Sequence, residues 1–193
     1  LLAAATVCGA AAGDPPADRR PPPAPVASHQ DPAASLLQDP AEVYRLGVTF
    51  PAFLDRAENL VEVWRGNWEA ARVPEDVLPR VAALPGAWHL LVVAADGCQD
   101  SANSIPFLAR FAEEVEGVER RMVEPDLGRP LMEARPTPDG RAATSTVILL
   151  NDEMEEVGCW IERPARQQMF YLSTVTTLDR STPAFQAAVR DFF

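Results

Sequence analysis

One continuous apolar run limits the folds open to this chain more than any other feature. Residues 88–95 read Trp-His-Leu-Leu-Val-Val-Ala-Ala, with Gly86 before them and Asp96-Gly97 after them. A strand that is apolar on both alternating faces is typical of the centre of a sheet that helices cover on each side. No later apolar run approaches the roughly 20 residues needed to span a bilayer. We therefore expect a central strand and no membrane-spanning segment.

The segments after this run alternate between helix and strand patterns. Residues 101–116 repeat apolar side chains at helical spacing, and Gly117 can end that helix. There follow a strand at 118–124, a short helix at 127–135, a strand at 146–150, its hairpin partner at 157–162 and two final helical stretches, the last begun by Thr182-Pro183. This order favours an α/β layer arrangement whose last two strands are antiparallel.

Two helices are expected before the central strand. Residues 53–68 place Phe53, Leu60, Trp64 and Trp68 close to one helical face, which predicts an amphipathic helix packed on the domain. A shorter helix at 74–84 begins with a proline and ends at Pro85-Gly86. We interpret both tryptophans as core residues.

The basic residues exclude several kinds of enzyme. All 17 cationic residues are arginine, so the chain lacks the lysine of a Walker-type phosphate loop or of pyridoxal-phosphate chemistry. The two histidines, His29 and His89, are too few for a multi-histidine metal site, and a Ser/His/Asp hydrolase would depend on His89 alone. We expect neither a metal nor a cofactor.

The net charge of −11 argues against nucleic acid and anionic membrane surfaces as partners, because the arginines are scattered. The acidic clusters at 113–116 and 152–156 lack the spacing of a calcium loop and are interpreted as solvated surface. We expect a monomer.

Residues 1–35 are predicted to lie outside the folded domain, which extends over 36–193. The first 13 residues resemble the tail of an export signal, with Cys8-Gly9 similar to a bacterial lipoprotein cleavage site at which Cys8 would carry a lipid anchor. The following proline- and alanine-rich stretch is predicted to be a disordered tether. A periplasmic or lipid-anchored location and a cytoplasmic one both stay open.

The turn after the central strand carries the family resemblance. Gly97-Cys98-Gln99-Asp100-Ser101 stands between strand and helix, Ile105-Pro106 follows in the helix, and Asn67-Trp68 precedes the strand. Over roughly residues 40–165 this pattern resembles the bacterial thioredoxin-like group, which has a helical N-terminal extension and a Cys-x-Asp-Ser turn. The resemblance implies a thioredoxin-like three-layer α/β fold, in which helices flank a central mixed sheet.

The resemblance also implies a site for redox chemistry. Its catalytic residues would be Cys98, Asp100 and Ser101, and its substrate-docking loops would contain Gly97 and Gln99 on one side and Thr144, Ser145 and Thr146 on the other.

Three positions depart from the family pattern. Gly97 replaces the usual tryptophan, so the turn is expected to be less packed. Ser101 replaces the second cysteine of dithiol members, and Ser145 replaces the cis-proline before the third strand. Because a cis bond before a non-proline residue costs about 3 kcal/mol, we expect a trans bond there.

The reactivity of Cys98 depends on opposing effects. The helix N-terminus favours a thiolate, and Ser101 is placed to donate a hydrogen bond to the sulfur. Asp96 and Asp100 disfavour a thiolate, and no arginine is close to them in sequence. Sequence alone does not decide the balance.

The other two candidate groups are interpreted as structural. Cys159 is predicted on the outer hairpin strand, too far from Cys98 for a disulfide. His89 is predicted at the opposite end of the central strand, where it cannot act as a base for Cys98.

Two functions therefore remain open. The first is monothiol thiol–disulfide exchange through Cys98, on protein or low-molecular-weight disulfides. The second is a redox-inactive thioredoxin-fold module that binds a partner through the loops at 96–101 and 143–146.

Overall fold

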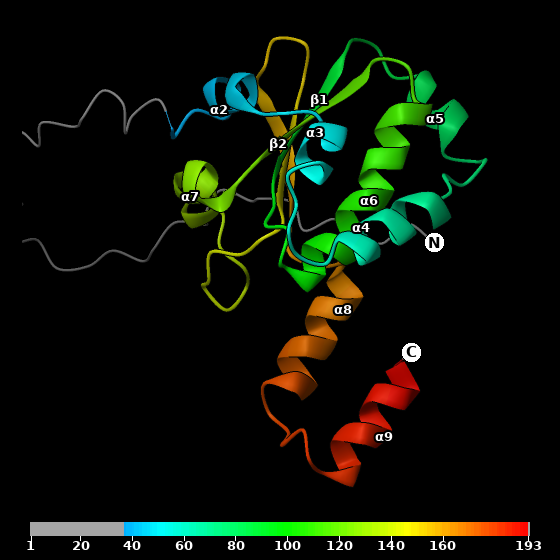
Figure 1. Cartoon of the computed structure of the whole chain (residues 1–193), viewed down its shortest axis with the longest axis vertical. Helices are drawn as coiled ribbons and strands as arrows, with labels where there is room; N and C mark the ends of the chain where they lie inside the picture. Colours follow the sequence, from blue (N-terminus) through cyan, green and yellow to red (C-terminus); the bar gives the residue numbers. More distant parts are fainter. Residues whose placement is uncertain (1–36, 193) are drawn as a thin grey trace, which may run out of the picture.

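The computed structural model describes residues 37–192, and Figure 1 shows their arrangement. The elements in chain order are α2 (Pro40–Leu46), α3 (Phe50–Leu54), α4 (Val61–Ala70), α5 (Leu78–Ala82), β1 (Trp88–Val93), α6 (Gln99–Glu114), β2 (Val118–Val123), α7 (Pro125–Glu133), β3 (Thr146–Leu150), β4 (Glu156–Ile161), α8 (Ala165–Phe170), the π-helical turn η1 (Tyr171–Val175) and α9 (Pro183–Phe192). The predicted leader and tether, with Cys8, lie outside the described residues.

The four strands form one mixed sheet in the order β2-β1-β3-β4. β1 pairs parallel with β2 and antiparallel with β3, and β3 pairs antiparallel with β4. The expected central strand is therefore confirmed, as is the antiparallel hairpin. In this topology the end of β1, the start of β3 and the end of β4 share one edge of the sheet.

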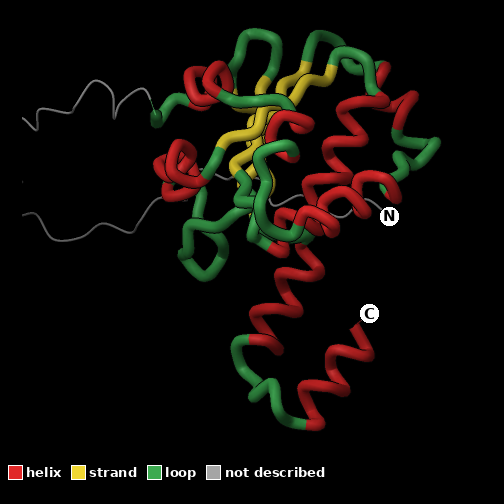
Figure 2. The backbone as a smooth tube through the Cα atoms, in the orientation of Figure 1, coloured by secondary structure: helices red, strands yellow, loops and turns green. Residues whose placement is uncertain are grey.

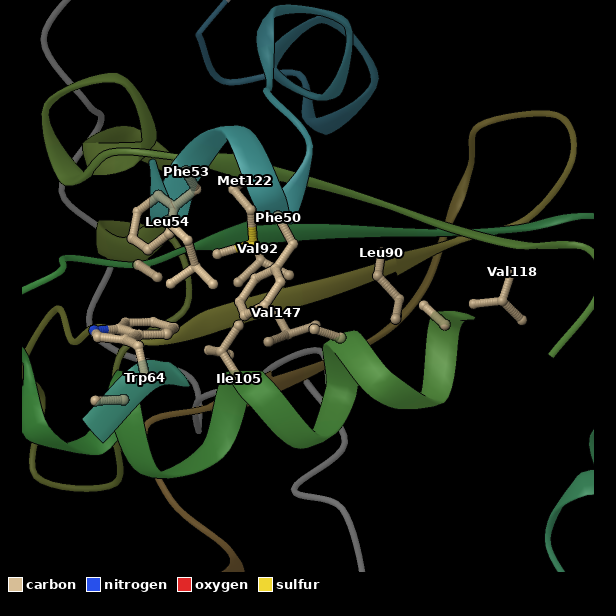
Figure 3. Packing of buried hydrophobic residues seen from close by; sticks show 14 of the residues in the cluster. Phe50, Phe53, Leu54, Trp64, Leu90, Val92, Ile105, Val118, Met122 and Val147 are labelled. Atoms are coloured by element: carbon tan, nitrogen blue, oxygen red, sulfur yellow. The ribbon is translucent and has the colours of Figure 1, made fainter. Parts of the chain in front are cut away.

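Alternate residues of β1 enter two separate layers of core, which explains why the run is apolar throughout. Leu90 and Val92 pack on one face with side chains from α3, α4 and α6, among them Phe50, Trp64 and Ile105 (Figure 3). Leu91 and Val93 pack on the other face with side chains from α2 and α7, among them Val43 and Leu131. The sheet with a helical layer on each side confirms the expected three-layer α/β fold.

α7 approaches β1 closely because it carries Gly128. A Cβ built on Gly128 would lie 2.4 Å from Cγ1 of Val93, which is closer than real Cβ contacts. Glycine is therefore required for this helix to pack at its present distance from the sheet.

The expected single helix at 53–68 is wrong, because the chain forms α3 and α4 with a turn between them. Leu60 has a left-handed backbone, with φ of 50°. The backbone N–H groups of Glu58 and Asn59 turn away from the helix direction and donate to the carboxylate of Asp96, at 2.7 and 2.9 Å. The periodic pattern was real, since Phe53 and Trp64 are both buried, but a long-range polar contact interrupts the helix.

The chain ends in an arm that we define as residues 165–192, containing α8, η1 and α9. Figures 1 and 2 show it projecting away from the sheet and its covering helices. The main contacts of α8 and α9 are with η1, inside the arm itself. None of the helices between residues 37 and 192 combines the length and the apolar composition that a membrane span needs.

Candidate functional site

Cys98 lies at the N-terminus of α6, as expected from the sequence. It is the N-cap residue of this 16-residue helix, and its carbonyl accepts the N–H of Ala102 at 2.9 Å. Its thiol is free and half-buried. The unpaired N–H groups of the first helical turn point toward this position and favour negative charge on the sulfur.

The loop before β3 faces Cys98. The thiol donates to the carbonyl oxygen of Thr144 at an Sγ–O distance of 3.6 Å. Ser145 is fully buried, and its carbonyl accepts the N–H of Glu162 at 2.7 Å. Thr146 donates its hydroxyl to Ala143 at 2.8 Å. The two predicted loops therefore meet at one edge of the sheet.

The expectation of a trans bond before Ser145 is wrong, because the peptide bond between Thr144 and Ser145 is cis. The intrinsic preference for a trans bond is opposed here by contacts on both sides of it, since Thr144 faces Cys98 and Ser145 pairs with the residue that follows β4.

The carboxylate of Asp96 is held by the turn between α3 and α4. Besides the N–H groups of Glu58 and Asn59, the side-chain amide of Asn59 donates to it at 3.2 Å. Partial burial acts to raise the pKa of Asp96, but these donors outweigh it and the pKa lies below the ordinary value. Trp64 donates its indole N–H to the Asp96 carbonyl at 2.8 Å, so its buried ring also fixes the turn.

The carboxylate of Asp100 is paired with an arginine that sequence proximity did not reveal. Arg163 donates Nε and Nη2 to the two oxygens of Asp100 at 3.1 and 2.7 Å. Its side chain is 10% exposed, against 24% for Asp100. The two residues are 63 positions apart, yet Arg163 follows β4 and thus reaches the edge where α6 begins.

Arg163 is itself fixed by a larger network. It pairs with Glu162 at 2.9 Å, and its guanidinium lies 4.0 Å from the ring centroid of Tyr171. Arg141 pairs with Glu162 at 3.2 Å, so this buried carboxylate has two arginine partners. Sequence reasoning missed these residues because they come from three segments far apart in the chain.

Two hydroxyls beside the cysteine lack partners. Ser101 and Ser145 are both fully buried, and within the described part of the chain neither hydroxyl oxygen has a hydrogen-bond partner. The expected donation from Ser101 to the sulfur is therefore not formed in this state. Both side chains retain an unused donor next to Cys98 or its facing loop.

The remaining predicted docking residues flank the cysteine. Gln99 donates its side-chain amide to Asn103 at 3.2 Å, along α6. Gly97 is exposed, and a Cβ built on it would lie 3.6 Å from the Cβ of Asn59, an ordinary contact distance. The turn has room for a side chain where the family has tryptophan.

Cys159 and His89 lie away from this site, as expected. Cys159 is buried in the middle of β4, opposite Ile148 of β3. His89 lies near the start of β1, where its Nδ1 is 3.2 Å from the hydroxyl of Tyr44. Between residues 37 and 192, no three His, Cys, Asp or Glu side chains are grouped to hold a metal ion.

A family model described as Thioredoxin matches residues 47–179. No curated protein matches the chain.

Two solved structures share the fold. A protein of unknown function from Pseudomonas aeruginosa is 20% identical, with a TM-score of 0.54 over 79% of this chain and 93% of that one. An HIV epitope-scaffold is also 20% identical, with a TM-score of 0.54 over 78% of this chain and 97% of that one. At this identity the likeness concerns the fold alone.

Proposed function

The chain belongs to a thioredoxin family, and from that premise we propose that it performs monothiol thiol–disulfide exchange through Cys98. The substrates would be protein or low-molecular-weight disulfides. The observation that carries the proposal is the neutralisation of Asp100 by Arg163, because Asp100 was one of two charges that oppose a thiolate at Cys98.

The second opposing charge is offset as well. Three hydrogen-bond donors from Glu58 and Asn59 solvate the Asp96 carboxylate. With both aspartates paired, the helix N-terminus favours the thiolate, and it acts against the hydrogen bond from the thiol to the Thr144 carbonyl, which favours the protonated form. The half-exposed position of Cys98 gives an incoming disulfide access to it.

The proposed reaction has two exchange steps. The Cys98 thiolate attacks one sulfur of the substrate disulfide, forming a mixed disulfide and releasing the other half as a thiolate that takes up a proton. An external thiolate then attacks the substrate sulfur of the mixed disulfide, forms a new disulfide with it and releases the Cys98 thiolate. Two external thiols supply the two electrons that reduce the substrate, one as the attacking thiol and one by exchange with the new disulfide.

The second thiol must come from outside because Ser101 stands where a resolving cysteine would stand. Its buried, unpartnered hydroxyl suits a different task, since it can donate to the sulfur once the proton has left. The facing Thr144–Thr146 loop presents backbone groups at the same edge, where an extended substrate would dock.

The proposal is tested by alkylation and by a coupled assay. We expect iodoacetamide to modify Cys98 at pH 7, and glutathione with hydroxyethyl disulfide to turn over. Cys98→Ser should lose both signals. Alkylation only above about pH 9, with unchanged turnover in Cys98→Ser, would leave the redox-inactive binding module as the better account.

Arg163→Gln tests whether neutralisation of Asp100 by Arg163 favours the thiolate of Cys98. An unneutralised carboxylate two residues from the sulfur, partly exposed to water, is worth roughly 1 kcal/mol. Alkylation at pH 7 should therefore slow about four- to sevenfold. Arg129→Gln is the matched control, because that arginine pairs with exposed Asp126 away from Cys98, and its rate should equal that of the parent.

Ser101→Cys tests whether Ser101 occupies the position of the resolving cysteine. The variant has two thiols at the two ends of one helical turn, so the mixed disulfide can be resolved within the chain. We expect it to reduce the substrate with a single-turnover amplitude that no longer depends on glutathione, whereas the parent stops at the mixed disulfide. Equal behaviour of the two proteins would contradict the proposed role.

A further inference from the structure

The arm of residues 165–192 has no hydrophobic core of its own. None of its apolar side chains is buried, and its two buried residues, Gln168 and Thr174, are polar. α8, of 6 residues, continues directly into η1, of 5 residues, and α9 has 10 residues; helical segments this short are marginally stable in water without tertiary packing. The two ends of the arm pack on each other through the stacked rings of Phe170 and Phe192, whose centroids lie 4.2 Å apart, and an apolar surface that covered the arm would stabilise it further.

The body of the same chain carries an apolar groove of about 670 Å³ between α6 and the β3–β4 hairpin. Residues on its walls include Asn103, Phe107, Leu149, Val157, Trp160 and Pro164. The described residues leave it open, with Phe107 45% and Val157 49% exposed. It is wide enough to admit large side chains from another element.

The exposed apolar residues are concentrated on these two surfaces. Six large hydrophobic side chains are exposed in the described part of the chain, and two of them, Phe107 and Val157, lie on the groove. Two more, Met169 at 66% and Leu178 at 39%, lie on the arm. α9 adds Phe185, Ala188 and Val189 at i, i+3 and i+4, all half-exposed.

The arm is held away from its own groove. Its base is attached by Tyr171, which stacks on Arg163, and by Gln168, which accepts a hydrogen bond from Arg163 at 3.3 Å. From this base α8 and α9 project away from the sheet (Figure 1). With these contacts in place the arm of the same chain lies away from the groove, and a second copy can supply its arm to the groove in this same conformation.

We propose that two copies of the chain form a dimer in which each arm docks into the groove of the other. In a twofold-symmetric dimer each copy gives its arm to the groove of the other, so the arm–groove contact forms twice. No arm or groove is then left to bind a third copy.

Charge supports a second copy as the occupant. The chain has a net charge of −11, but the arm carries three arginines against two aspartates. Docking a slightly basic arm on an acidic body avoids the repulsion that two bodies would meet face to face. The proposal replaces the monomer expected from the sequence, and it is independent of the redox function.

The test compares charge substitutions on the two surfaces. By light scattering after size exclusion, we expect the full chain to be a dimer. The arm variant Met169→Asp/Leu178→Asp and the groove variant Phe107→Asp/Val157→Asp should each weaken association about 30-fold or more. Since all four side chains are exposed in the single chain, folding should be retained, and circular dichroism checks this.

Leu46→Asp/Leu84→Asp is the matched control, because these are the other two exposed large hydrophobics and lie on neither surface. It should remain a dimer. Mixing the arm variant with the groove variant should restore association, because one intact arm then meets one intact groove. A monomeric parent chain, a dimer insensitive to the groove variant, or no recovery on mixing would overturn the proposal.

Discussion

Replacing Arg163 by methionine tests whether the network at the end of β4 stabilises the fold. The substitution keeps most of the side-chain volume but removes the charge and every donor. It deletes the paired bonds to Asp100 at 3.1 and 2.7 Å and the contact with Glu162 at 2.9 Å. It also removes the guanidinium that stacks on Tyr171.

The magnitude follows from burial. The side chains of Arg163 and Glu162 are only 10% and 5% exposed, and removing one partner of such a pair costs about 3–5 kcal/mol. Arg141 still pairs with Glu162 at 3.2 Å, so the lower limit, about 3 kcal/mol, applies. Arg163→Lys keeps the charge but not the forked geometry, and we expect it to lose about half as much.

Urea denaturation at pH 7 measures the loss. If the free energy of unfolding falls by about 2 kcal/mol for each molar of urea, a loss of about 3 kcal/mol should lower the unfolding midpoint of Arg163→Met by about 1.5 M urea. Arg129→Met is the control, because its pair with Asp126 is 59% and 97% exposed and is worth less than about 1 kcal/mol. Adding Asp100→Asn to Arg163→Met should recover part of the loss by removing an unpaired charge. If Arg163→Met unfolds at the same urea concentration as Arg129→Met, the reasoning about buried pairing is refuted.

Three further predictions concern backbone and pH. Gly97→Ala should stabilise the fold by about 0.4–1 kcal/mol in the same assay, since its backbone is not left-handed and a Cβ meets Asn59 at an ordinary 3.6 Å; destabilisation would show that the turn needs glycine. Gly128→Ala should destabilise it by about 1–3 kcal/mol, because its Cβ would lie 2.4 Å from Val93, and an unchanged midpoint would contradict the close packing of α7. The lowered pKa of Asp96 means that its contribution is present above about pH 4 and is lost as the pH falls through the folded-state value, so the difference in stability between the parent and Asp96→Asn should shrink on acidification. If the difference in stability between the parent and Asp96→Asn grows below pH 4, the pKa of Asp96 is raised by folding and not lowered.

The parts of the fold that sequence predicted are those with local periodic signals. The run at 88–95 indicated a covered central strand because both of its faces are apolar, and the structure shows a core layer on each side of β1. The position of Cys98 followed from the same logic, since a turn between strand and helix places its residue at the helix N-terminus.

The parts that sequence did not predict depend on contacts between distant segments. The helix expected at 53–68 is interrupted because Asn59 and its neighbour bind Asp96, and no local pattern encodes that bond. Arg163 could have been found only from topology, by noting that β4 ends at the edge where α6 begins. The cis bond before Ser145 lies in the loop that faces Cys98, at the same end of the sheet.

The bonds from Glu58 and Asn59 to Asp96 have a thermodynamic consequence, because they connect the N-terminal helices to the cysteine turn. Detaching α3 and α4 would leave a bare carboxylate two residues before the sulfur, so docking of these helices and ionisation of Cys98 are linked equilibria. Linkage is reciprocal. The docked helices contribute some free energy to stabilising the thiolate. Formation of a mixed disulfide removes that negative charge, so it changes the free energy of docking of the helices by the same amount. Under the proposed exchange reaction, forming the mixed disulfide at Cys98 would therefore change how firmly α3 and α4 are held against the turn.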